Sequence, residues 1–239
     1  MAHLSADEKR RYVAEMFARI SPRYDLMNSL MTGGLHHRWK RTTARLTAGH
    51  AVGPALDVAT GTGDLAFALA DCVNVTKVVG VDLLPEMLTI ASRRQASRSG
   101  HRRSIQFVRG DALQLPFPDA SFIGATAGFS LRNMPNLPAA IEEMVRVVRP
   151  GGRVTTLELT PMDRGLKTRL FRLYFHRVVP LMGQVVAGDR AAYTYLPQSV
   201  DYFLEADRLA ELFRQCGLVD VGFVPLGFGA VAVHYGVKP

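Results

Sequence analysis

The chain has 239 residues, of which 48% are hydrophobic and 21% are charged, and this composition excludes disordered and collagen-like proteins. Its 29 Lys and Arg residues exceed its 21 Asp and Glu residues, which gives a formal net charge of +8. The two cysteines supply neither a disulfide framework nor a zinc site, and no apolar run reaches the roughly 18 residues that span a bilayer. We therefore expect a soluble, cytoplasmic protein that forms one domain over residues 1–239.

The positive charge is concentrated in three stretches. Residues 1–50 hold nine cations against four acids, residues 87–110 hold six arginines and no acid, and residues 164–188 hold five cations and no acid. Such an excess fits nucleic acid, an anionic membrane or an ordinary solvated surface. No RNA-binding motif or zinc finger accompanies it, so we expect no nucleic acid partner.

The N-terminal 50 residues are predicted to form a helical cap. Apolar side chains recur at helical spacing within residues 6–20, and Pro22 ends that helix because the residue before a proline disfavours the α region. Further helices are predicted at 24–31 and 36–48.

From Ala55 onward, strands and helices alternate. Apolar strands are predicted at 55–59, 78–82, 105–108, 121–128 and 153–159, with helices at 64–70, 85–96 and 137–148. The remaining segments are a long helix at 164–188, a helix at 205–216, and strands at 218–224 and 230–237 that form an antiparallel edge pair. The pattern predicts an α/β fold with a doubly wound, seven-stranded, mostly parallel sheet and an antiparallel C-terminal edge strand. Its parts are the cap (1–50), a nucleotide-binding core (51–160) and lid helices with the terminal strands (161–239).

A glycine-rich loop joins the first strand to the first helix of this core. Gly61 and Gly63 lie within the run DVATGTGD at 57–64, which satisfies a permissive form of the dinucleotide fingerprint. Asp82 follows about 20 residues later at a strand end, where a carboxylate can accept both hydroxyls of a ribose. This pattern fits both NAD and S-adenosylmethionine (SAM).

Charge separates these two nucleotides. Asp57 and Asp64 make the loop acidic, which suits the sulfonium and α-amino groups of SAM and opposes a pyrophosphate. Asp111 and Ala112 follow the third strand, where a carboxylate or a backbone amide can contact an adenine edge. These features favour SAM, with NAD-dependent oxidoreduction as the alternative.

Several segments of the chain match the pattern of one enzyme family. The run RYDLMN at 23–28, followed by GLH at 34–36 and WK at 39–40, resembles the N-terminal signature of the ubiquinone/menaquinone biosynthesis C-methyltransferases, and AYTYLPQSV at 192–200 is similar to their late Y-x-Y-L-x-x-S element. Further matches are DVATGTGDL at 57–65, LPF at 115–117, FSLRN at 129–133, RPGGR at 149–153 and LEL at 157–159. The resemblance extends from about residue 16 to the C-terminus.

The resemblance implies a Rossmann-like class I methyltransferase that uses SAM to methylate a ring carbon of a prenylated quinol. Demethylmenaquinol and a demethoxy-ubiquinol both remain open, and the short chain favours the former. The loop pattern and the resemblance together assign the cofactor to Asp57, Thr60, Gly61, Thr62, Gly63, Asp82, Leu83, Asp111, Ala112 and Gly128. One departure concerns Gly128 and Ser130, because the family usually has serine at the first position and glycine at the second.

Transfer of a methyl group from a sulfonium requires an aligned ring carbon and exclusion of water. Arg132 and Asn133 follow the fourth strand, at the edge where such folds bind ligands. Because arginine stays protonated, we expect Arg132 to stabilise the phenolate and a water to take the proton; the alternative is a pairing with a surface acid. Tyr24 and Asn28 are expected to orient the ring, with Tyr195 as a further substrate contact, although Tyr24 also fits plain packing.

Other features are less specific. His36 and His37 adjoin each other without further ligands at metal spacing, so no metal is expected. Asp64 either contacts the cofactor or caps its helix. The helix at 164–188 is either ordinary or a lid over a prenyl chain that rests on the inner face of an anionic membrane. A homodimer, a methyltransferase for a small secondary metabolite and a non-enzymatic nucleotide- or RNA-binding module also remain alternatives.

Overall fold

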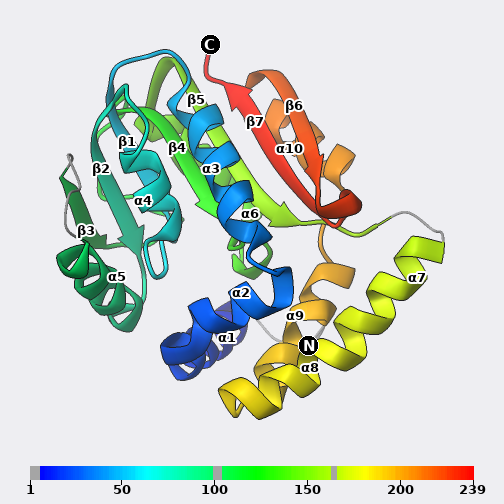
Figure 1. Cartoon of the computed structure of the whole chain (residues 1–239). Helices are drawn as coiled ribbons and strands as arrows, with labels where there is room; N and C mark the ends of the chain where they lie inside the picture. Colours follow the sequence, from blue (N-terminus) through cyan, green and yellow to red (C-terminus); the bar gives the residue numbers. More distant parts are fainter. Residues whose placement is uncertain (1–5, 99–103, 163–165) are drawn as a thin grey trace.

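The computed structural model describes residues 6–98, 104–162 and 166–239. At its centre is a seven-stranded sheet with the order β3-β2-β1-β4-β5-β7-β6 (Figure 1). The strands are β1 (Gly53–Val58), β2 (Val75–Asp82), β3 (Ile105–Arg109), β4 (Phe122–Gly128), β5 (Val148–Leu159), β6 (Val219–Leu226) and β7 (Val231–Val237). All pairings among β1 to β5 are parallel, whereas β7 is antiparallel to β5 and β6. The predicted mostly parallel sheet is confirmed.

The last two strands form the predicted edge pair, but their order differs from the expectation. The C-terminal strand β7 lies between β5 and β6, so β6 is the edge strand. Val231 and Val233 of β7 are buried, as suits an interior strand. Pro225 lies in β6, and because proline has no N–H to donate, it is tolerated at an edge and not between two partners.

Strand β5 begins five residues earlier than predicted. Val148 already pairs with Phe122, and the register then shifts so that Gly124 pairs with Arg153. The intervening residues stay attached to the C-terminal segment, since Gly151, with a φ of 74°, donates to the Lys238 carbonyl at 2.8 Å and Lys238 donates back to the Gly152 carbonyl at 2.9 Å. The proline-glycine run therefore makes an irregularity within the strand instead of a loop before it.

Helices cover both faces of the sheet (Figure 1). One face holds a hydrophobic cluster with Ala44 and Phe67, from α3 and α4. The cluster on the other face includes Met144 and Phe213, from α6 and α10. Burial on both faces explains why the parallel strands read as nearly continuous apolar runs. These helices are α3 (Leu35–Ala48), α4 (Asp64–Ala70), α5 (Pro85–Ser97), α6 (Leu137–Val147) and α10 (Ala206–Gln215), each within two residues of its prediction.

A separate helical layer lies beyond the carboxyl ends of the parallel strands (Figure 1). Its own apolar cluster joins Met16 and Met27 of the N-terminal helices to Phe175, Val179 and Tyr193 of the later ones. This layer comprises α1 (Ala6–Ile20), α2 (Tyr24–Thr32), α7 (Leu166–Leu173), α8 (Val179–Met182) and α9 (Arg190–Asp201). The predicted cap and lid helices therefore pack on each other.

Two details of this layer differ from the sequence prediction. The long helix is interrupted by two π-helical turns, Tyr174–Val178 and Gly183–Ala187, and Pro180 between them lacks the N–H that a regular helix requires. Helix α9 was not predicted, because Pro197 lies within it. Within the described residues, no helix is both long and apolar enough to cross a membrane.

Candidate functional site

The glycine loop between β1 and α4 has the backbone conformation that its sequence suggests. Gly61 and Gly63 have φ values of 55° and 87°, in the left-handed region that residues with a Cβ rarely adopt. A Cβ on Gly63 would lie 3.0 Å from the Phe67 ring. The loop therefore requires glycine at the first position for its conformation and at the second for both conformation and space.

Asp82 ties this loop to the end of β2. Its carboxylate accepts hydrogen bonds from the N–H groups of Gly61 at 2.8 Å and Leu84 at 2.9 Å. The side chain is buried, and this burial raises the pKa of the Asp82 carboxyl although the backbone donors oppose the change. A fixed acceptor thus stands at the sheet edge, as the sequence predicts.

A cavity opens at this edge, between the strand ends and helix α1. Val13 and Phe17 of α1 form part of its wall. Among the residues predicted to bind the cofactor or substrate, those that line it are Tyr24, Gly61, Asp82, Leu83, Asp111, Ala112, Gly128 and Asn133. The strand ends therefore bring together most of the predicted cofactor set.

Four predicted cofactor residues are not in the wall of this cavity. Asp57 is buried and accepts a 2.6 Å hydrogen bond from the Thr60 hydroxyl. Burial raises the pKa of Asp57 to about 7, even though the Thr60 bond lowers it. The Thr62 hydroxyl donates to Asp25 at 2.7 Å, and Gly63 begins α4 as its N-cap. These residues fix the conformation of the glycine loop without contributing to the cavity wall.

Asp64 does not cap its helix, so one of its two expected roles is wrong, and a contact with the cofactor stays a prediction. Its carboxylate is bound by Lys40 at 2.6 Å and by Arg94 at 2.5 Å, and helix α4 has Gly63 at its N-cap with no side-chain capping bond. Burial works against ionisation, but the two cations still bring the pKa of Asp64 well below its usual range. Its negative charge is thus compensated by the protein itself.

Asp25 is a residue that the sequence reasoning missed. It accepts the Thr62 hydroxyl and forms an ion pair with Arg94 at 2.9 Å. These two contacts link helix α2 of the cap to the glycine loop and to α5. Its place in the RYDLMN run was the only signal, and that run does not reveal a partner so distant in the sequence.

A second, apolar cavity adjoins the first and shares Phe17, Tyr24 and Phe129 with it. Its wall comes from the cap, the lid helices and the strand ends. Most of the wall is apolar or aromatic, including Met16, Ile20, Met31, Trp39, Phe171 and Leu196. The predicted substrate residues Tyr24, Asn28, Arg132 and Tyr195 all line this cavity.

Asn133 lies at the junction of the two cavities. It lines the first cavity, and its side-chain oxygen accepts a 3.0 Å hydrogen bond from the hydroxyl of Tyr195, which lines the second. The predicted pair of Arg132 and Asn133 forms the short helix Leu131–Asn133 directly after β4. The structure therefore places both at the expected sheet edge.

Arg132 pairs with an acid, as the alternative prediction for this residue stated, but the acid is buried and does not lie on the surface. Its guanidinium forms an ion pair with Glu158 of β5 and donates to the Phe129 carbonyl at 2.7 Å and to Ser199 at 3.2 Å. Burial raises the pKa of Glu158, while the charge of Arg132 lowers it. In the sequence, Glu158 stands out only as the middle residue of the LEL segment at 157–159, and that segment does not indicate its pairing with Arg132.

The departure at 128 and 130 has a structural counterpart. Gly128 lines the first cavity, and so does Ser130 two residues later. The Ser130 hydroxyl oxygen is buried and has no hydrogen-bond partner among the described residues. Between them, Phe129 has a φ of 57°, which is strained for a residue with a side chain. A hydroxyl is therefore present at the cavity, displaced from 128 to 130.

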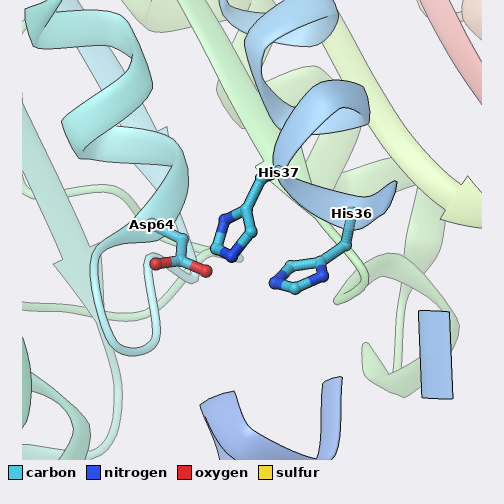
Figure 2. A group of neighbouring side chains, drawn as sticks. All are labelled: His36, His37 and Asp64. Carbon is cyan, nitrogen blue, oxygen red and sulfur yellow. The ribbon is translucent and has the colours of Figure 1, made fainter. Parts of the chain in front are cut away.

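The Asp64 carboxylate stands beside the two adjoining histidines, and the sequence analysis did not predict this neighbour. Figure 2 shows His36 and His37 of α3 next to Asp64 of α4, and their ligand atoms lie within 4.8 Å of one another. Lys40 and Arg94 already occupy the Asp64 carboxylate. The cluster is thus a charge-compensated group and not an open set of metal ligands.

Comparison with known proteins gives a consistent result. The model of the ubiE/COQ5 methyltransferase family matches residues 4–238. The chain is 42% identical over 231 residues to the demethylmenaquinone methyltransferase of Deinococcus radiodurans, which covers 97% of this chain and 94% of that relative. It is 38% identical over 232 residues to the ubiquinone/menaquinone biosynthesis C-methyltransferase UbiE of Dinoroseobacter shibae, covering 97% and 92%.

Among solved structures, a SAM-dependent methyltransferase from Thermotoga maritima, described as a possible histamine N-methyltransferase, has a similar fold. The TM-score is 0.66 at 18% identity, over 95% of this chain and 99% of that chain. At this identity the likeness concerns the fold alone.

Proposed function

The chain belongs to the ubiE/COQ5 methyltransferase family, and we propose that it methylates a ring carbon of a prenylated quinol, with demethylmenaquinol as its acceptor. Family and fold confirm the predicted class I fold and the predicted enzyme class, a SAM-dependent methyltransferase. When bound, SAM supplies an electrophilic methyl group on a sulfonium. The choice of demethylmenaquinol is supported by relatives of that name in Deinococcus radiodurans and Roseiflexus castenholzii.

The observation that carries this proposal is the pair of adjoining cavities. One is edged by the acceptor Asp82 and the strand-end loops, and the other is apolar and aromatic. Because Phe17, Tyr24 and Phe129 belong to both walls, a hydrophobic ring in the second cavity would face a donor in the first. Val13 and Phe17 of α1 and Tyr24 of α2 bring the cap into the wall of the first cavity, where it would help to keep water from the reacting groups.

The residues of the first cavity fit SAM. Asp82 is held by two backbone donors with its carboxylate in the wall, where it would accept the ribose hydroxyls. Ala112 and Met134 provide apolar contact for an adenine. The Ser130 hydroxyl adds a polar group that has no hydrogen-bond partner among the described residues.

Ser130→Ala is expected to weaken SAM binding about fivefold to tenfold, because one hydrogen bond contributes roughly 1 kcal/mol. Isothermal titration calorimetry with SAM measures the change. Gly128→Ser is the complementary variant, and in the Ser130→Ala background it should restore affinity. Unchanged affinity in Ser130→Ala would remove this residue from the binding site.

We assign the second cavity to the quinol ring and the start of its prenyl chain. Tyr24 and Asn28 would orient the ring, and Tyr195 would hold Asn133 in place through the 3.0 Å bond. The charge of Arg132 is balanced by Glu158. We therefore propose that Arg132 acts as a hydrogen-bond donor in the cavity wall and not as an uncompensated charge for a phenolate.

Transfer of labelled methyl from SAM to reduced acceptors tests the proposed function. Demethylmenaquinol and a demethoxy-ubiquinol analogue of equal tail length are assayed anaerobically in detergent, with a tail-free naphthoquinol as a third acceptor. We expect demethylmenaquinol to give the highest kcat/KM, since its bicyclic ring and tail fill an apolar cavity. Equal or higher turnover of the benzoquinol would overturn the choice of ring.

We also propose that the helical layer contacts an anionic membrane that holds the quinol. Large apolar side chains are exposed on α2 and on the segment that runs from α7 to the second π turn. These two segments adjoin, because Arg23, just before α2, donates to the Val186 carbonyl at 3.0 Å. The exposed apolar residues are Leu26, Leu30, Leu170, Leu173, Leu181 and Val185. Exposed arginines beside them would bind anionic headgroups.

Vesicle flotation tests this contact. The protein should float with vesicles that contain anionic lipid at low salt and should dissociate at high salt. Neutralising Arg169 and Arg172 together should reduce binding about 30-fold, since each cation near the surface contributes about 1 kcal/mol. Binding that ignores both salt and these substitutions would exclude an electrostatic contact.

A further inference from the structure

His36 has a buried ring nitrogen that the protein leaves without a partner. The residue lies near the start of α3, is 1% exposed and lines the apolar cavity. Within the residues that the structure describes, its Nε2 makes no hydrogen bond. Because an unsatisfied buried polar atom is costly, a group of the bound ligand is the natural partner of this nitrogen.

The hydrogen bonds around His36 fix its tautomer. The Thr32 hydroxyl donates to the Asn28 carbonyl at 2.7 Å, so its only hydrogen is used. The same hydroxyl oxygen lies 2.8 Å from His36 Nδ1, and it must therefore accept a hydrogen from that nitrogen. With its proton on Nδ1, the neutral ring has a lone pair at Nε2.

The surroundings keep the ring neutral at physiological pH. Burial lowers the pKa of His36 to about 4, and the charges of Lys40 and His37 on the same helix act in the same direction. Asp64, from α4, opposes them. Arg132 lies across the same cavity with its charge paired to Glu158. A neutral imidazole can accept a proton, unlike the guanidinium of arginine.

Its place in the fold puts His36 in the apolar cavity and beside the start of α4. A ring nitrogen of His36 lies within 4.8 Å of the Asp64 carboxylate (Figure 2), and Asp64 directly follows the glycine loop. His36 also shares the apolar cavity with Tyr24 and Phe129, which line the cofactor cavity as well. The imidazole therefore stands in the wall of the cavity assigned to the quinol ring, next to the first residue after the glycine loop.

We propose that Nε2 of His36 accepts the proton of the quinol hydroxyl and is the general base of the methyl transfer. This inference rests on the proposed function, because it assumes a hydroxylated aromatic acceptor in the apolar cavity. It replaces the sequence-based expectation that a water held by Arg132 takes this proton. The charge of Asp64 favours the imidazolium that forms, although Lys40 and Arg94 offset much of it.

The step balances as follows. The O–H bond breaks and its proton moves to Nε2, so that an electron pair of the oxygen enters the ring. The ortho carbon bonds to the methyl carbon as the sulfur–methyl bond breaks, which leaves S-adenosylhomocysteine. That carbon then loses its hydrogen as a proton to water, and the oxygen regains the proton held on His36. Each turnover therefore releases one proton and restores the aromatic ring.

The first test compares His36→Gln with His50→Gln, an exposed histidine just after the same helix. We expect the kcat of His36→Gln at pH 7 to fall about 10²- to 10⁴-fold and to rise steadily with pH, since solvent must then remove the proton. The wild-type kcat should stay flat between pH 6 and 9, and His50→Gln should follow it. A flat profile for His36→Gln would leave only a structural role.

The second test does not depend on turnover. Nitrogen NMR of the His36 ring should show the proton on Nδ1, and a naphthoquinol added with S-adenosylhomocysteine should shift the Nε2 resonance. Thr32→Val should abolish the tautomer preference and Thr32→Ser should keep it. A proton on Nε2 in the wild type would overturn the proposal. If the wild type shows this shift but methylates neither quinol, then the proposed function fails, although Nε2 of His36 still contacts a bound quinol; if it methylates a quinol without this shift, then the role of His36 fails and the proposed function stands.

Discussion

Replacing Arg132 with alanine is expected to lower the free energy of unfolding by about 3–5 kcal/mol, because it leaves a buried carboxylate without its partner. The side chains of Arg132 and Glu158 are 5% and 1% exposed. The loss should be smaller at acidic pH, since burial raises the pKa of Glu158 and protonation then removes the uncompensated charge. Chemical denaturation at pH 5 and pH 8 measures both effects.

Two further variants make this result interpretable. Arg132→Met combined with Glu158→Leu removes both charges and should recover most of the stability. Arg214→Ala breaks an exposed ion pair, in which both side chains are about half exposed, and should cost at most about 1 kcal/mol. A single Arg132→Ala variant as stable as the wild type would contradict the buried-pair argument.

The double variant also separates catalysis from folding. If it binds SAM normally but its turnover collapses, then the donors of Arg132 are needed at the substrate. If turnover survives, then Arg132 serves to hold the turn after β4, through its bond to the Phe129 carbonyl at 2.7 Å, and the role proposed for it at the quinol is wrong. Turnover of Arg132→Ala by itself would not distinguish a lost contact with the substrate from a destabilised fold.

The parts of the site that the sequence predicted well are those that local patterns determine. Gly61 and Gly63 are needed for the backbone of a tight turn, and Asp82 ends a strand that apolar periodicity identifies. The carboxyl ends of parallel strands meet at one edge, so Asp111 and Gly128 could be placed near them from topology alone.

The parts that the sequence did not predict depend on partners far apart in the chain. Asp64 looked like a free acid of the loop until Lys40 and Arg94 were seen to bind it. Glu158 reads as one residue of a buried strand, and only the fold brings Arg132 to it. The lone pair of His36 is a different case, because Asn28, Thr32 and His36 are only four residues apart and the sequence does not say which hydrogen bonds they form.

The second large effect expected concerns Asp57, which should limit the stability of the free enzyme. Its folded-state pKa of about 7 lies above the ordinary value of 3.8, so the wild type loses stability as pH rises from about 4 through 7. Asp57→Asn lacks this loss. At pH 8 its unfolding free energy should exceed that of the wild type by up to about 4 kcal/mol, and at pH 4 the two should be equal.

The same substitution should weaken SAM binding about 10- to 100-fold, because the ionised carboxylate favours the cationic groups of SAM over a neutral amide. In the wild type, affinity should rise between pH 6 and pH 8 as binding draws Asp57 into its ionised form with release of a proton. Calorimetry in two buffers of different ionisation enthalpy detects that proton, and it should vanish in Asp57→Asn. Asp71→Asn, an exposed control, should change neither stability nor affinity appreciably. A variant that binds SAM normally with an unchanged pH dependence would show that Asp57 only shapes the loop.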